Sequence, residues 1–234
     1  AMMRWFHLGR LYGCLPISFH SESIADNNNH SQIDDAGSND LHANTEAAIE
    51  KVANTVTVPT GLFFYRLLTK YEPDTDQFIR VGRRCFDVSY SDEFWTNLAT
   101  SDHFTILGAF DSSQTLLGAC SVILNLHNYL SVEYLPEPEQ RLLEGREQVC
   151  YISTVFVDAS LRRRGLGRQL ISRTVDYARC RLSDNSLIYL HVRPLNASAR
   201  SLYSSLGFSE GPLIVGYYTN CGEEKDALIY YRTL

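Results

Sequence analysis

Hydrophobic and polar residues follow two different periods along most of the chain, and this predicts strands alternating with helices from residue 61 onward. Two nearly continuous apolar runs, Val149–Val157 and Leu187–Val192, predict strands that are covered on both faces. Five further strand-like runs are Gly61–Thr69, Phe104–Phe110, Leu116–Leu126, Leu213–Thr219 and Ala227–Arg232. Apolar residues at helical spacing predict four helices over Asp74–Phe86, Asp92–Thr100, Leu166–Leu182 and Ala197–Leu206.

The order of these elements predicts an α/β fold with a mixed sheet. The strand–helix–strand order over residues 149–192 implies two parallel neighbours joined by a right-handed crossover. The polar turn Asp111–Gln114 implies an antiparallel hairpin earlier in the chain. A polar, proline-containing segment, His127–Glu147, is interpreted as an insertion without a helix or strand of its own.

The first part of the chain has a different composition. Residues 21–54 are rich in Asn, Ser and Asp and contain few aliphatic residues, so they cannot bury enough apolar surface to offset the entropy lost on ordering. We therefore expect residues 1–55 to form a disordered, acidic extension and residues 56–234 to form one domain.

Charge is distributed unevenly between these two parts. The formal net charge is −6, but seven acids in residues 22–50 and two arginines in residues 1–21 account for all but one of those negative charges. A nearly neutral domain has no broad electrostatic footprint for nucleic acid, so we predict no nucleic-acid partner. A near-neutral net charge is still compatible with a local cluster of positive charges that binds an anion.

Cysteine spacing and hydropathy narrow the class further. The six cysteines lie far apart, without a C-x-x-C pair or a His-rich neighbour, so reduced thiols and no metal site are predicted. No apolar stretch reaches the roughly 18 residues of a membrane-spanning helix, which favours a cytoplasmic protein. Residues 2–21 contain two arginines and no acid, so mitochondrial targeting by the N-terminus stays open.

A basic, glycine-containing segment connects the strand at 149–157 to the next helix. Its two glycines permit close approach of the backbone to a ligand, and the positive end of a helix dipole favours an anion rather than arginines. A bound anion explains the four arginines, and a solvated basic turn is the alternative. The segment lacks the third glycine of a dinucleotide fingerprint and the G-K-[ST] of a P-loop. It comprises Arg162, Arg163, Arg164, Gly165, Leu166, Gly167 and Arg168.

A second motif, N-x-x-A-x-x-x-Y-x-x-x-G-F, runs from Asn196 to Phe208, directly after the strand that contains His191. The ordered pair, R-x-x-G-x-G and then this motif about 30 residues later, resembles the GCN5-related N-acetyltransferase (GNAT) superfamily. Within it, the chain is most similar to protein N-terminal acetyltransferases of the NatE and NatF types, and the insertion favours NatF. Four stretches carry that similarity: Phe86–Trp95, Cys150–Thr154, Ile188–Val192 and Tyr217–Tyr218.

The resemblance covers roughly residues 61–234. It implies a GNAT fold, in which parallel strands four and five of a central, mixed, seven-stranded sheet splay around acetyl-CoA. It also implies an acyltransferase that needs no metal and acetylates the N-termini of proteins, with Met-starting proteins as the expected substrates. A ribosome-associated or NatA-like complex is a further expectation. NatF relatives carry a membrane-binding segment after the fold, so association with a membrane surface is expected if the natural chain continues past Leu234.

The resemblance also assigns roles to residues. His191 becomes the general base, Tyr151 its partner through an ordered water, and Tyr203 the acid near the sulfur. An α-amino group has a pKa of about 8, so a histidine is a sufficient base. The cofactor contacts are Val155, Phe156, Val157, the segment Arg162–Arg168, Asn196 and Tyr203. The acceptor contacts are Phe86, Val88, Tyr90, Ser153, Tyr217 and Tyr218.

Other interpretations of the same residues remain. A histidine in an apolar strand is commonly a hydrogen-bonded core residue, Asn196 is a good N-cap, and Tyr203 suits core packing. A lysine acetyltransferase of the histone type needs a stronger base and a wider slot, which paired Tyr217 and Tyr218 disfavour. A noncatalytic CoA-binding subunit and small-molecule acetylation are further alternatives. Asp87 stands where the family usually has proline, which suggests a preference for a basic second residue; a solvated loop acid is the alternative.

Overall fold

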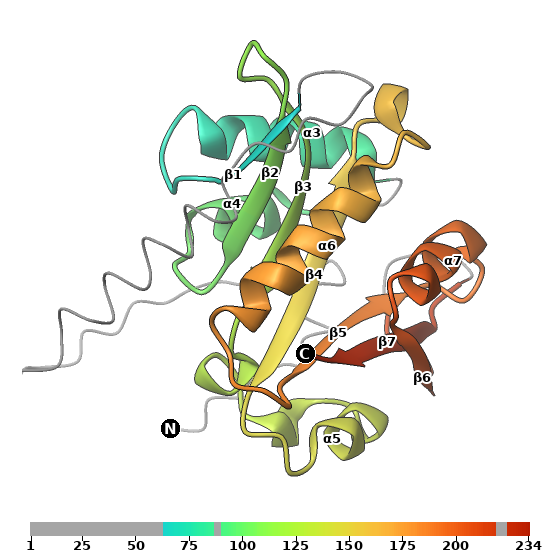
Figure 1. Ribbon diagram of the computed structural model, residues 1–234. Helices are drawn as coiled ribbons and strands as arrows, with labels where there is room; N and C mark the ends of the chain where they lie inside the picture. The colour runs from blue at the N-terminus through green and yellow to red at the C-terminus, as the bar shows by residue number, and fades with distance from the viewer. Residues whose placement is uncertain (1–62, 87–89, 219–223) are drawn as a thin grey trace, which may run out of the picture.

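The computed structural model describes residues 63–86, 90–218 and 224–234. A single seven-stranded sheet has the order β1-β2-β3-β4-β5-β7-β6 (Figure 1). Its strands are β1 Phe64–Leu67, β2 Thr105–Phe110, β3 Leu116–Ile123, β4 Val149–Val157, β5 Leu187–Val192, β6 Ser209–Ile214 and β7 Ala227–Thr233. β4 and β5 are parallel, and all other neighbours are antiparallel. The predicted mixed seven-stranded sheet is therefore confirmed.

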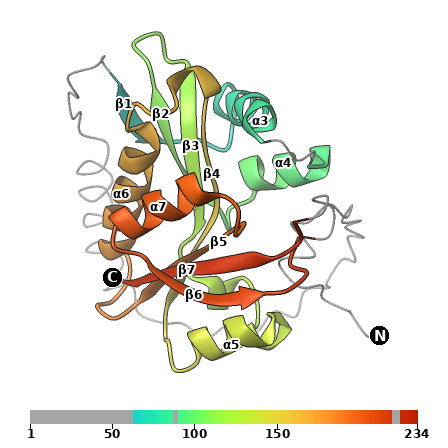
Figure 2. The same ribbon diagram turned by 90° about the vertical axis from the view of Figure 1, so that its right-hand side faces the viewer.

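Two hydrophobic cores lie on opposite faces of this sheet. One core includes Phe78 and Trp95, and the other includes Leu170 and Tyr203. α3, α4 and α5 accordingly cover one face, and α6 and α7 cover the other (Figure 2). The helices are α3 Asp74–Cys85, α4 Asp92–Thr100, α5 Glu137–Leu143, α6 Leu166–Arg179 and α7 Ala197–Ser205.

The central strands contribute to both cores, which explains their uninterrupted apolar sequences. In β4, Tyr151 faces the first core, while Cys150 and Ile152 face the second. Both strands have the bounds that the sequence predicts. Among the described residues, no helix combines the length and the apolar character needed to cross a membrane.

The parallel strands separate halfway along their length. β4 pairs with β5 only from Val149 to Ile152, after which β4 continues beside β3 and β5 continues beside β7. The ladder between β3 and β4 also shifts its register at Ser153, which has no partner on β3. Such an irregularity redirects the side chains next to it. The separation leaves the backbone edge of β4 after Ile152 open toward β5.

The insertion before β4 is more structured than the sequence predicts. It contains two short 3-10 turns, Leu126–Asn128 and Val132–Tyr134, and the helix α5. Prolines had favoured an irregular segment, but Pro138 lies in the first turn of α5, where a proline is compatible with a helix. A helix this short depends on its contacts with the rest of the protein.

The position predicted for the sixth strand, Leu213–Thr219, is wrong. β6 spans Ser209–Ile214, directly after α7, and the chain turns at Gly216, whose φ is +67°. Pro212 is tolerated because β6 is an edge strand of the sheet. Tyr217 and Tyr218 consequently lie in the loop that follows β6. Residues 1–55, Asp87 and Val88 lie outside the described residues, so the expectations for them stay predictions.

Candidate active site

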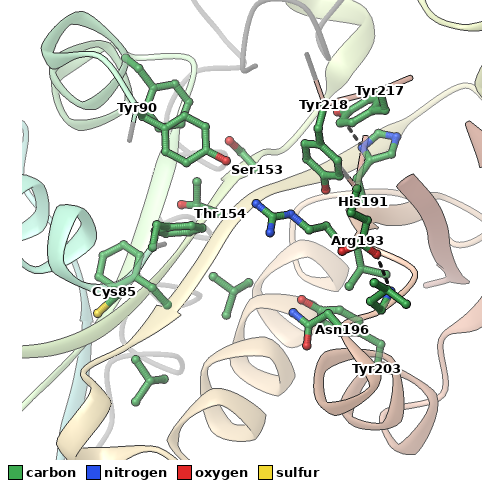
Figure 3. A pocket seen from close by; sticks show the side chains of 18 of the residues that line it. Cys85, Tyr90, Ser153, Thr154, His191, Arg193, Asn196, Tyr203, Tyr217 and Tyr218 are labelled. Atoms are coloured by element: carbon green, nitrogen blue, oxygen red, sulfur yellow. Dashed lines mark hydrogen bonds between the residues drawn. The ribbon is translucent and has the colours of Figure 1, made fainter. Parts of the chain in front are cut away.

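A cavity of about 670 Å³ opens where β4 and β5 separate (Figure 3). Residues predicted from the sequence form most of its wall: Phe86, Tyr90, Tyr151, Ser153, Val155, Phe156, Val157, Arg162, His191, Asn196, Tyr203, Tyr217 and Tyr218. Seven wall residues were not predicted: Cys85, Phe94, Thr154, Val192, Arg193, Leu195 and Glu224. Most of these are sequence neighbours of predicted residues, so their positions follow from the strands and loops that carry them.

One side of the cavity holds a cluster of a histidine and two phenols. Nδ1 of His191 lies 3.2 Å from the Tyr151 hydroxyl and 3.0 Å from the Tyr217 hydroxyl, and the two hydroxyls are 3.3 Å apart. The Tyr217 ring also stacks on the imidazole, with 4.1 Å between ring centroids. Figure 3 shows the ring of Tyr217 directly beside that of His191. β4, β5 and the loop after β6 therefore converge on one imidazole nitrogen.

Burial determines the protonation of the two phenols. It raises the pKa of Tyr151 above its usual range, and it raises the pKa of Tyr217 well above that range. Both hydroxyls therefore keep their protons at neutral pH and are able to donate hydrogen bonds. A protonated phenol beside an imidazole is suited to relay a proton between a substrate and the ring.

The other ring nitrogen of His191 faces the insertion. Nε2 lies 3.5 Å from Oε2 of Glu139, a completely buried residue of α5. Oε1 of the same carboxylate accepts a hydrogen bond from the Tyr189 hydroxyl at 2.5 Å. Glu139 is not among the predicted site residues, because a polar, proline-containing segment gave no indication of a helix that packs on the sheet. Pro138 was the one sequence feature compatible with a helix here, because proline is tolerated in the first turn of a helix.

Aromatic side chains form the opposite side of the cavity. Tyr90 stacks on Phe94 with 4.3 Å between centroids, and Phe86 meets Tyr90 edge to face at 5.7 Å. Ser153, at the register shift of β4, lies between this aromatic cluster and Tyr218 (Figure 3). The small Ser153 side chain leaves room between the two sides. An apolar group of moderate size fits beside the aromatic cluster.

The turn between β4 and α6 has the geometry of an anion site. Gly165 is the N-cap of α6 and adopts a left-handed φ of +86°. An added Cβ there meets no atom within 4 Å, so conformation rather than space favours glycine. The first amides of α6 have no partner within the helix, and they lie at its positive end. An anion such as a pyrophosphate therefore fits this turn.

Three of the four predicted arginines of this turn also hold neighbouring elements. Arg162 Nη2 donates to the carbonyl of Cys85 at 2.9 Å, at the end of α3. Arg163 and Arg168 donate to hydroxyls of α7, at 3.2 Å for Ser198 and 2.6 Å for Ser205. These side chains connect the turn to the end of α3 and to α7. Arg163, Arg164, Gly165, Leu166, Gly167 and Arg168 lie outside the cavity wall itself.

Asn196 is the N-cap of α7 and Tyr203 lies within this helix, and both line the cavity wall (Figure 3). The Asn196 side chain accepts a hydrogen bond from the Ala199 amide at 3.1 Å, which is N-capping as the sequence suggested. Tyr203 packs near Tyr230 and Phe208, and burial raises the pKa of its phenol. Its hydroxyl therefore stays protonated at neutral pH.

Comparison with known proteins adds to this geometry. The model of the acetyltransferase (GNAT) family matches residues 64–208. This chain belongs to the GNAT family of acetyltransferases. Acetyl-CoA is the co-substrate of the GNAT family. Within the described ranges, no group of three or more His, Cys, Asp or Glu is placed to hold a metal ion.

Sequence relatives share parts of this GNAT domain. The chain is 39% identical over 104 residues to the [ribosomal protein bS18]-alanine N-acetyltransferase of Salmonella typhimurium, covering 43% of this chain and 69% of the relative. Its match to the Escherichia coli enzyme of that name spans about half (49%) of that enzyme. It is 27% identical over 163 residues to histone acetyltransferase MCC1 of Arabidopsis thaliana, covering 67% of this chain and 65% of the relative.

Solved structures support the GNAT fold. Arabidopsis thaliana NAA60 in complex with acetyl-CoA aligns with a TM-score of 0.58 and 20% identity, over 74% of this chain and 98% of that one. The ribosomal-protein-S18-alanine N-acetyltransferase from Escherichia coli aligns with a TM-score of 0.54 and 18% identity, over 72% and 93%. At these identities the alignments establish the fold, and the similarity to NatE and NatF stays a prediction.

Proposed function

We propose that this protein is an N-terminal acetyltransferase, which transfers the acetyl group of acetyl-CoA to the free α-amino group of a protein. The observation that carries the proposal is the hydroxyl–imidazole cluster of Tyr151, Tyr217 and His191 at the separation of β4 and β5. The name of the [ribosomal protein bS18]-alanine N-acetyltransferase supports an α-amine acceptor, because the only nitrogen of an alanine residue at a chain start is its α-amine. The aromatic wall favours a first residue with a large apolar side chain, and Met is our proposed first residue.

The cavity and the turn together fit acetyl-CoA. The open edge of β4, at Val155, Phe156 and Val157, offers backbone groups to the amides of the pantetheine arm. The first turn of α6 and its arginines suit the pyrophosphate. The bound co-substrate supplies a thioester, and the amide of Val155 is our proposed donor to its carbonyl oxygen.

Different residues around the cavity are proposed to accept the proton of the amine and to donate a proton to the thiolate. An α-amino group has a pKa of about 8, so only a modest base is needed to remove its proton and make the nitrogen a nucleophile. His191 accepts the proton through Tyr151 or an ordered water. The amine nitrogen bonds to the acetyl carbon, the carbon–sulfur bond breaks, and the protonated phenol of Tyr203 donates a proton to the leaving thiolate.

The acceptor peptide lies between the aromatic cluster and the loop after β6. Phe86 and Tyr90, with Val88 in the undescribed segment, are proposed to hold the first side chain, and Ser153 lies between them and Tyr218. Tyr217 and Tyr218 are proposed to hydrogen-bond the peptide backbone. A ribosome-associated or NatA-like complex, a cytoplasmic location and the conditional membrane association all stay predictions.

A lysine side chain is the second candidate acceptor. The similarity to a protein named a histone acetyltransferase favours it, since that match covers 67% of this chain. The Tyr217 hydroxyl, within hydrogen-bonding distance of both Tyr151 and His191, narrows the route by which a lysine would reach the base. This contact favours the α-amine over the lysine side chain.

A peptide panel tests the proposal. The protein is incubated with acetyl-CoA and peptides that start with Met or Ala, each with a free or a blocked N-terminus and with or without lysine. We expect acetylation of free N-termini, fastest for Met, and none after blocking. Acetylation that persists on blocked, lysine-containing peptides would assign the protein to the lysine class instead. Faster turnover of the Ala peptide would contradict the preference for Met but not the acetylation of N-termini.

A further inference from the structure

The insertion before β4 places a carboxylate behind the proposed catalytic histidine. Glu139 lies in the middle of α5 and is 0% exposed. Leu143, on the same helix, is 2% exposed and belongs to the core that also contains Tyr151 and Tyr189. The helix is therefore docked on the sheet by apolar contacts, and Glu139 points into a dry environment.

Two buried polar atoms face each other across this contact. Within the described part of the chain, neither Oε2 of Glu139 nor Nε2 of His191 has a hydrogen-bond partner elsewhere, and the two atoms are 3.5 Å apart. A buried polar atom without a partner costs about 1–3 kcal/mol, so each atom is the natural partner of the other. A contact of this length tightens readily when a substrate is bound.

The second carboxylate oxygen limits how the pair is protonated. Oε1 accepts a hydrogen bond from the Tyr189 hydroxyl at 2.5 Å. Burial raises the pKa of Tyr189 well above its usual range, so this phenol stays a donor. Oε1 is therefore occupied as an acceptor, and Oε2 is the atom that is available to accept a hydrogen bond from the imidazole N–H.

From this arrangement we infer that Glu139 is a positioning residue, whose carboxylate holds the proton of His191 on Nε2 and leaves the lone pair of Nδ1 facing Tyr151 and the cavity. The inference rests on the proposed function, in which Nδ1 receives the proton of the attacking amine. That proton forms an imidazolium between the carboxylate and the cavity, and Glu139 stabilises this charge without itself being protonated. The amine loses one proton to His191 and the departing thiolate gains one from Tyr203; transfer of a proton from the imidazolium to the Tyr203 phenolate through solvent then restores both residues.

The tautomer of His191 is the most direct test, and it requires no variant. Long-range proton–nitrogen NMR of histidine-labelled protein distinguishes a protonated Nε2 from a protonated Nδ1; His191→Asn assigns the signals. We expect the Nε2–H tautomer for the neutral ring. An Nδ1–H tautomer would show that the carboxylate does not act as proposed and would overturn the inference, whatever the enzyme acetylates.

Glu139→Gln tests the carboxylate with little change of shape. We expect kcat to fall by about 10- to 100-fold, with the KM for acetyl-CoA unchanged, because the amide no longer favours one tautomer or stabilises the imidazolium. The acid limb of the kcat–pH profile should move to lower pH. The titratable groups that face the ring are Tyr151 on β4, Tyr189 on β5, Glu139 on α5 and Tyr217 after β6, and only Glu139 is changed.

Glu137→Gln is the matched control, because Glu137 is on the same helix, is exposed and pairs with Arg141. We expect it to leave kcat and the pH profile unchanged. Equal kcat values and pH profiles for the wild type and Glu139→Gln would refute a positioning role. If the wild type acetylates no free N-terminus, the proposed function fails, and the tautomer measurement still decides whether Glu139 controls the ring.

Discussion

The two segments that flank β4 contribute different kinds of groups to the proposed active site. The turn after β4 brings backbone amides and a left-handed glycine at the start of α6, with its arginines at the surface. The insertion before β4 brings one buried side chain, Glu139, on a short docked helix. One segment is suited to hold a phosphate-bearing co-substrate, and the other to set the protonation of a histidine. Binding and chemistry should therefore be separable by substitution.

The largest expected effect is that of His191→Ala. Removing the proposed base should lower kcat by about 10²- to 10⁴-fold, because proton transfer by a positioned base contributes about that much. Calorimetric titration should find unchanged affinity for acetyl-CoA, since the proposed pyrophosphate site is at the start of α6 and His191 is on β5. Full activity would remove His191 from the chemistry, and a parallel loss of affinity would show that the two functions are coupled.

Leu143→Ala should loosen the insertion without touching the turn. Leu143 is nearly fully buried in the core beneath α5, so truncation should lower the free energy of unfolding by about 2–5 kcal/mol. Urea unfolding measures this loss. At a temperature where the variant stays folded, kcat should fall while acetyl-CoA affinity is kept. A variant that loses affinity and keeps kcat would reverse the roles given to the two segments.

Gly165→Ala should affect the turn instead. A residue with a Cβ at φ +86° is strained, which costs about 1–2 kcal/mol, and relieving that strain displaces the amides at the start of α6. We expect a higher KM for acetyl-CoA with kcat retained at saturation. Gly167→Ala is the control for stability, because its Cβ would meet Leu202 at an ordinary 3.7 Å. Equal loss of stability in both variants would contradict the conformational argument.

The smallest expected effect is on the free energy of unfolding at alkaline pH, where the phenols around His191 would ionise. Burial raises the pKa of Tyr151, Tyr189 and Tyr217 above the value of about 10 in an unfolded chain. The folded protein then binds more protons than the unfolded chain above pH 10, so stability is complete below that pH and falls as pH rises. Urea unfolding between pH 8 and 11 should show a shallower decline for Tyr151→Phe. An identical slope would contradict the burial of an ionisable phenol.

The same two segments show what a sequence can and cannot reveal. The turn is local: Gly165, Gly167 and the arginines are contiguous, and their chemistry follows from the start of a helix. The strands β4 and β5 were also predicted with their bounds, because burial on both faces leaves an apolar run. Glu139 is different, since its partner Tyr189 is 50 residues away, and only the docking of α5 on the sheet brings the two together.

Non-local contacts also explain the misplaced strand. Leu213–Thr219 has the apolar pattern of a strand, but pairing with β7 and the left-handed turn at Gly216 end β6 at Ile214. The convergence of His191, Tyr151 and Tyr217 depends on that turn. Chemistry-bearing residue types were visible in the sequence, whereas the hydrogen bonds among them depend on how three separate elements meet.

A single peptide that carries both candidate acceptors distinguishes acetylation of the α-amine from acetylation of a lysine side chain. A Met-starting peptide with a free N-terminus and a single internal lysine is acetylated to low conversion, and tandem mass spectrometry locates the acetyl group. We expect the acetyl group on the α-nitrogen of Met, with the lysine unmodified. Acetyl on the lysine alone, or on neither amine while acetyl-CoA binds, would contradict this expectation.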